Sequence, residues 1–238
     1  MEAPERSNGK NARMGTSRTL VASEDMHSHL VGQLNSALRR PGMYGGETTL
    51  RVLVDHLLFM EREPRAGAEH QRLLEERGAW SPTGVTGAFR RLVPGGDYEH
   101  GMASVHAELA HRRGWLASDR VLDARAYDAL TGRVRRWAET DRVWAEVVAE
   151  FGPPSVLFGG GSPFSGKTLG YLTEDRRQPV VFFHLWNGTE PGAEPSWPPP
   201  RPEPVLLAVR FGGGPFRATF TFTPEGRRLR PAPDEHGC

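Results

Sequence analysis

The sequence is nearly empty of cysteine and of lysine. Its single cysteine is Cys238, the last of 238 residues, so no disulfide can form within the chain and no cluster of thiolates can hold a metal. Among 30 basic residues only Lys10 and Lys167 are lysines. Because arginine is used almost everywhere else, an individual arginine carries little functional information here, whereas a lysine carries more.

Long apolar runs and a strong net charge are also missing. No stretch of about 18 apolar residues occurs, as a membrane-spanning helix requires, and the N-terminal segment lacks the apolar core of a secretory signal. The formal net charge is +1, which gives no global attraction to nucleic acid or to an acidic membrane. We therefore expect a cytoplasmic protein that binds neither nucleic acid nor a membrane.

The order of the patterned segments predicts an α+β fold. Apolar residues at helical spacing, with Pro or Gly where each pattern stops, predict helices throughout residues 25–151. The first helix starts near Ser23 and stops before Pro41, and the last is one long helix over 124–151. Residues 152–226 instead hold short segments rich in β-branched and aromatic residues, which predict strands at 155–160, 167–174, 179–188, 204–211 and 217–226.

These segments predict a single α+β domain over residues 25–226, in which the helical part (25–151) packs on an antiparallel meander of about five strands (152–226). Residues 1–24 are polar and aperiodic and predict a disordered tail, and 227–238 predict a C-terminal tail. The alternation TFTFT at 219–223 indicates a strand with one buried face and one exposed face.

Two further features concern how this domain packs. An apolar stripe that includes Trp137 and Val147 predicts that the last helix lies across the sheet. The proline-rich stretch Glu190–Pro204 predicts an exposed loop, because proline cannot donate a hydrogen bond to a strand ladder.

Residues 159–170, GGGSPFSGKTLG, contain a Walker A pattern that ends in Lys167 and Thr168. In a P-loop this pattern connects a buried parallel strand to a helix, whose N-terminal amides hold the phosphates. Here the next strand follows too soon for the crossover of about a dozen residues that a parallel pair needs, and His184 stands where the acidic residue of a Walker B strand belongs. The pattern therefore predicts a glycine-rich turn between strands.

Lys167 and the segment FFHLWNG supply the main candidate binding residues. Alternation along a strand places His184 and Trp186 on one face and Asn187 on the other. Two interpretations of the His184 face stay open, an aromatic core with one satisfied histidine and a concave binding face. Lys167 is either a solvated lysine at the start of a strand or a point-charge contact to a carboxylate or phosphate.

The histidines do not predict a metal site. Ligands on one helical face need a spacing of three or four residues, whereas His106 and His111 are five apart and His27 and His29 are two apart. No Gly-x-Ser-x-Gly nucleophile elbow occurs either. We expect no metal and no cofactor.

Two resemblances rest on short motifs. LRRPGMYGG, residues 38–46, resembles the RPGMYIG opening of the DNA gyrase B-type ATPases, but the next predicted helix holds no Asn and no Asp-x-Gly-x-Gly loop follows, so we interpret the motif as a helix stop and a packed turn. The motifs RRPGMYGG, FGPPSVLFGG with KTLGY, and VVFFHLWNG together resemble a group of uncharacterised actinobacterial proteins. That resemblance implies one folded unit and no particular activity. Arg40 and Tyr44 of the first motif complete the candidate binding residues.

These features favour a non-catalytic protein that binds another protein. A toxin-immunity protein, or another partner-neutralising protein, is one concrete member of this class. The alternative is an enzyme of a specialised metabolic pathway with a site around Lys167 and His184. Nucleotide binding through the Walker A-like string ranks third.

Overall fold

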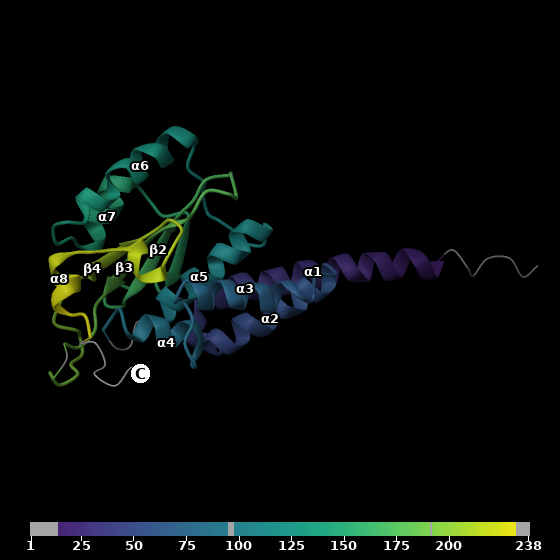
Figure 1. Cartoon of the computed structure of the whole chain (residues 1–238), viewed down its shortest axis with the longest axis horizontal. Coiled ribbons are helices and arrows are strands. Elements are labelled where there is room, and N and C mark those ends of the chain that lie inside the picture. Colours follow the sequence, from purple (N-terminus) through teal and green to yellow (C-terminus); the bar gives the residue numbers. More distant parts are fainter. Residues whose placement is uncertain (1–13, 95–97, 191, 232–238) are drawn as a thin grey trace, which may run out of the picture.

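The computed structural model describes residues 14–94, 98–190 and 192–231, with side chains from residue 23 onward. Figure 1 shows a central sheet between two groups of helices. The helices are α1 (Met14–Arg39), α2 (Gly46–Met60), α3 (Ala66–Glu76), α4 (Gly84–Arg90), α5 (Tyr98–Arg113), α6 (Ala124–Trp137), α7 (Trp144–Phe151) and α8 (Pro224–Arg228). The strands are β1 (Val156–Gly159), β2 (Lys167–Tyr171), β3 (Val181–Trp186), β4 (Val205–Arg210) and β5 (Phe220–Phe222).

The sheet is an antiparallel meander in the order β1-β2-β3-β4-β5. Each strand pairs with the next one along the chain. The short turn-forming connections β1–β2 and β2–β3 close antiparallel hairpins, whereas the longer proline-rich segment joins β3 to β4. The predicted α+β fold, with mostly N-terminal helices and a five-stranded sheet, is therefore confirmed. The strand expected over 217–226 is shorter than predicted, since Phe216–Thr219 forms a 3-10 helix before β5 begins.

Helices cover both faces of this sheet. Residues of α1, α2, α4 and α5 share one apolar core with Val156, Phe158, Phe182, Trp186 and Leu207 of the sheet. Residues of α6 and α7 share a second core with Leu169, Tyr171, Phe183, Leu206 and Val209. The predicted packing of the 124–151 segment across the sheet is confirmed, and β2 and β3 are buried along their whole length.

The single long helix predicted over 124–151 is wrong, because α6 ends at Trp137 and α7 begins at Trp144. Between them Val143 is extended and forms a bridge with Val205 at the start of β4. The Trp144 amide donates to the Pro204 carbonyl at 3.0 Å. Pairing of this segment with backbone groups beside β4 therefore replaces a turn of helix.

Both predicted tails reach too far into the chain. Helix α1 begins at Met14, so the disordered tail is wrong for residues 14–24, while residues 1–13 lie outside the described residues. Figure 1 shows the start of α1 extending away from the rest of the molecule. At the other end α8 runs to Arg228, and Leu229 is buried in the core, so the folded part continues past residue 226.

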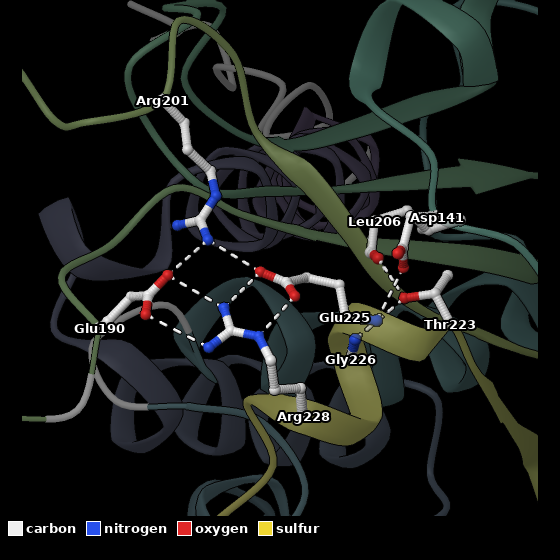
Figure 2. A network of polar contacts seen from close by, with 8 residues as sticks. All are labelled: Asp141, Glu190, Arg201, Leu206, Thr223, Glu225, Gly226 and Arg228. Carbon is white, nitrogen blue, oxygen red and sulfur yellow. Dashed lines mark hydrogen bonds and ion pairs between the residues drawn. The ribbon is translucent and has the colours of Figure 1, made fainter.

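The predicted exposure of the proline-rich stretch is confirmed for residues 192–198, and Trp197 is 79% exposed, whereas Glu190 and Arg201 are half-buried and Pro204 is buried. Its two ends are held by a network of ion pairs with α8 (Figure 2). Arg201 contacts Glu190 and Glu225, each at 2.8 Å, and Arg228 contacts the same two carboxylates at 3.0 and 2.7 Å. The loop is thus exposed at its centre and anchored at its base.

A buried ion pair joins the sheet to α5. Arg210 of β4 is 1% exposed, and its Nη1 lies 2.6 Å from Oε1 of Glu108. Its Nη2 donates to Oγ of Ser104 at 2.9 Å.

Among the helices that the structure describes, none is both long and apolar enough to cross a membrane.

Candidate functional site

The predicted binding residues fall into two separate groups. Lys167, His184, Trp186 and Asn187 are only 1–5% exposed and lie in or beside the sheet. Arg40 and the 40%-exposed Tyr44 flank the short 3-10 helix Pro41–Met43 that follows α1. Pro41 ends α1 as predicted, and the chain then turns through Gly45 with φ at +84°, a conformation that favours glycine.

The Walker A-like string is a hairpin connection. Gly159 at the end of β1 pairs with Lys167 at the start of antiparallel β2, as the turn prediction requires. Neighbouring residues of a strand face opposite sides, so Lys167 and Thr168 diverge. In a P-loop both side chains reach the same bound nucleotide. The string therefore lacks both the helix and the convergence that a P-loop needs.

Lys167 is buried against α7. Its Nζ donates to the Ser162 carbonyl at 2.7 Å and lies 3.6 Å from the centre of the Trp144 ring. Burial lowers the pKa of Lys167 to about 8. The solvated-lysine interpretation is wrong, since the charge contacts an aromatic face and a carbonyl inside the protein.

His184 faces the other side of the sheet and is enclosed by aromatic rings. Its ring lies 5.4 Å from that of Phe89 and 5.6 Å from that of Phe220, and its Nδ1 lies 3.0 Å from Oγ1 of Thr168. Burial, followed by the charge of Arg210, lowers the pKa of His184 well below its ordinary value. The cavity beside His184 and Trp186 holds only about 10 Å³. In the part of the chain that the structure describes, this face is an aromatic core and not a concave surface.

Asn187 connects two loops at one end of the sheet. Its Nδ2 donates to the Pro163 carbonyl at 3.2 Å and to the Arg201 carbonyl at 3.1 Å. The rings of Phe164 and Trp197, one from each loop, pack edge to face with centres 5.8 Å apart. Asn187 therefore holds the hairpin turn against the proline-rich loop.

A much larger cavity than the one beside His184 lies elsewhere, between α2 and α3. This α2–α3 pocket has a volume of about 540 Å³, and its lining includes Arg51, Val54, His70, Leu74, Trp80 and His106. Val54 and Leu74 give it an apolar base, and the guanidinium of Arg51 lies 4.8 Å from the centre of the Trp80 ring at its wall. Such a mixture of apolar surface and a few polar groups is typical of sites for small organic molecules.

His106 of α5 lies at the pocket beside a fixed carboxylate. Glu47 of α2 accepts hydrogen bonds from the amides of Val85 and Thr86 at 2.9 and 2.8 Å, and its Oε1 lies 3.7 Å from Nε2 of His106. Burial raises the pKa of Glu47, but the contact with His106 and the two amides outweigh burial and lower it to about 2. The carboxylate is therefore ionised at neutral pH.

The carboxylate of Glu47 fits only because residue 84 is glycine. Gly84 has φ at +77°, and a Cβ there would collide with the Glu47 carboxylate. The glycine thus permits the close approach that lets Glu47 bind the first amides of α4.

His70 of α3 also lines the pocket and is uncharged at neutral pH. Burial lowers its pKa to about 4, with further contributions from the charges of Arg112, His106 and other basic groups. Its Nε2 is buried without a hydrogen-bond partner among the described residues, as is Nε2 of His106. A neutral imidazole can donate a hydrogen bond from one ring nitrogen and accept one at the other.

Sequence reasoning missed this pocket for a physical reason. His70 and His106 lie on different helices, so a search for histidines at helical spacing cannot connect them. Only the packing of α3 and of α5 against α2 brings them to one cavity. Among the described residues, no group of three or more His, Cys, Asp and Glu side chains is placed to hold a metal ion.

Comparison with known proteins adds no assignment. The chain matches no protein-family model, no curated protein and no solved structure.

Proposed function

We propose that this chain is a non-catalytic binding protein and that its ligand, a small organic molecule with a planar ring and a hydrogen-bonding group, occupies the α2–α3 pocket. The observation that carries the proposal is the cavity itself. Its volume of about 540 Å³ is that of a small-molecule site, and the half-buried His70 and the buried His106 line it together with Trp80.

Each wall of the pocket contributes a different interaction. Trp80 and Leu74 offer apolar area to a ring, and the ring of Trp80 already accepts a cation at 4.8 Å from its centre. His70, neutral at pH 7, offers hydrogen bonding without the cost of burying a charge. The amides of α4 fix Glu47, and its carboxylate lies 3.7 Å from Nε2 of His106, which places a fixed negative charge at the polar side of the site.

The test is ligand-observed NMR with a panel of planar heteroaromatic molecules such as indole and quinoline. Ala68→Trp places a large ring at the pocket wall, whereas Glu69→Trp adds the same ring one position along, on a residue that does not line the pocket. We expect A68W to abolish binding and E69W to leave it unchanged. Equal binding by wild type and A68W would contradict the proposal.

The finer expectations of a protein partner and a toxin-immunity role stay predictions. The enzyme alternative is less favoured, because the structure does not bring its two central residues together. Lys167 packs on Trp144 beneath α7, whereas His184 packs on Phe89 on the opposite face of the sheet. A shared reacting centre would need both side chains on one face.

A further inference from the structure

A second cavity is built from four segments that are distant in the sequence. It has a volume of about 220 Å³ and lies where the end of α3, the end of α5, the turn between β2 and β3 and the glycine loop after β4 meet. We call it the basic pocket, after its lining residues Arg77, Glu108, His111, Arg112, Arg176 and Arg177.

Most of the negative charge near this pocket is already engaged. Glu108 pairs with the buried Arg210 at 2.6 Å. Asp175 accepts from Arg177 at 2.9 and 3.1 Å. The lining therefore keeps a surplus of positive charge.

Three arginines carry this surplus. Within the described residues Arg77, Arg112 and Arg176 form no ion pair with a carboxylate. The partial negative charge at the carbonyl end of α5 explains in part why two of these arginines lie there. Arg112 is in the last turn of α5, and the guanidinium of Arg176 packs over Gly114, just after that helix. Arg77 caps a different helix, so the end of α5 does not explain why all three line one cavity.

Arg77 also fixes the glycine loop that forms the opposite wall. Its Nε donates to the Gly214 carbonyl at 2.9 Å, while its Nη2 is buried without a hydrogen-bond partner. Gly212 has φ at +95°, and a Cβ placed on Gly213 would meet nothing within 4 Å. The loop therefore leaves open space beside its backbone, where no side chain competes with a ligand.

Beside the ion-paired Glu108, His111 is a second buried polar group of this pocket. It is 7% exposed, and its Nε2 has no hydrogen-bond partner among the described residues. Burial, followed by the charges of Arg176 and Arg112, lowers its pKa. A neutral His111 close to two guanidinium groups can donate an N–H to an anion without adding another buried charge.

We propose that the basic pocket binds a phosphate group, either as inorganic phosphate or as the phosphate of a small monoester. Arginine presents a planar fork of donors that matches a phosphate bidentately, and guanidiniums from α3, α5 and the β2–β3 turn surround one small volume. A group of nearly two negative charges suits three unpaired arginines better than a single carboxylate does. This site is separate from the α2–α3 pocket and does not depend on its ligand.

The test is isothermal titration of the full chain with inorganic phosphate and with phenyl phosphate, at constant ionic strength set with chloride. Arg112→Gln and Arg176→Gln each remove one guanidinium from an exposed position and leave the core intact. Arg136→Gln is the matched control, since Arg136 is an exposed arginine in the last turn of α6, outside the pocket lining.

We expect wild type and R136Q to bind with equal affinity, and R112Q and R176Q to bind at least about tenfold more weakly, as loss of a hydrogen bond to a charged group implies. Equal affinity for the two probes assigns the site to free phosphate, and tighter phenyl phosphate assigns it to a monoester. No heat of binding by wild type at millimolar probe would overturn the proposal. The same loss in R136Q would also overturn it, because binding would then follow overall charge.

Discussion

Lys167 carries a charge into the layer between the sheet and α7. It is 1% exposed, and its Nζ is held by the Ser162 carbonyl and by the face of Trp144. Burial lowers the pKa of this amine to about 8, so the folded state binds its proton less tightly than the unfolded chain does. The stability of the protein is therefore linked to the titration of this one residue.

Lys167→Met should reveal that linkage. The folded pKa lies below the unfolded one, so the stability contributed by the neutral amine is present above about pH 10.5 and is lost as the pH falls towards about 8. Between pH 10 and pH 7 the unfolding free energy of wild type should drop by roughly 2 kcal/mol relative to K167M. Urea unfolding at the two pH values measures this. A constant difference between the two proteins would show that Lys167 is not desolvated.

The sequence predicts the direction of side chains in a strand better than their exposure. Alternation placed His184 and Trp186 together, and the structure confirms it, because a period of two is a property of the strand alone. Whether that face is open depends on α4 and α5, which precede β3 by many residues. Burial of Lys167 depends in the same way on α7, so no local pattern revealed it.

At the scale of elements, the connection between α6 and α7 shows where helical periodicity misleads. The apolar stripe continues through the break, since both helices cover the same face of the sheet. The amide of Leu206 donates to the Arg142 carbonyl at 2.8 Å, which extended backbone permits and helical backbone does not. Periodicity reports which residues are buried, and it does not report the backbone path between them.

Trp137, at the end of α6, should contribute strongly to this layer. Its ring packs edge to face on Phe151 at 5.0 Å and on Phe183 of β3 at 6.2 Å. Because Trp137 is partly buried, Trp137→Ala should lower the free energy of unfolding by about 2 kcal/mol, less than the roughly 3–5 kcal/mol typical of a fully buried aromatic residue. Trp197→Ala is the control, because Trp197 is 79% exposed, and it should cost less than about 0.5 kcal/mol. Equal effects of the two substitutions in denaturant unfolding would refute the packing argument.

For the molecule as a whole, fold and site differ in how much the sequence reveals. The meander order follows from the tendency of consecutive strands to lie side by side, which allows few alternatives. The α2–α3 pocket and the basic pocket instead arise where segments distant in the sequence meet. The first brings His70 beside His106, and the second brings Arg77 beside Arg176. Side chains that converge only through tertiary packing leave no spacing in the sequence that could identify them.

The sheet should depend on the helical part for its stability. Each of its faces is covered by helices from residues 14–151, and the central strands have no exposed face of their own. Separated from those helices, residues 152–231 would expose both apolar faces of a small sheet to water. A small sheet without a covered apolar face is not stable on its own. We therefore expect the full chain to unfold in a single transition, with circular dichroism and tryptophan fluorescence giving the same midpoint. Fragments 14–151 and 152–231, produced separately, should show no cooperative unfolding, and mixing them should restore it in part. Two independent cooperative transitions would mean that the chain holds two domains, and the apolar layers between sheet and helices would then be interfaces between modules rather than one core.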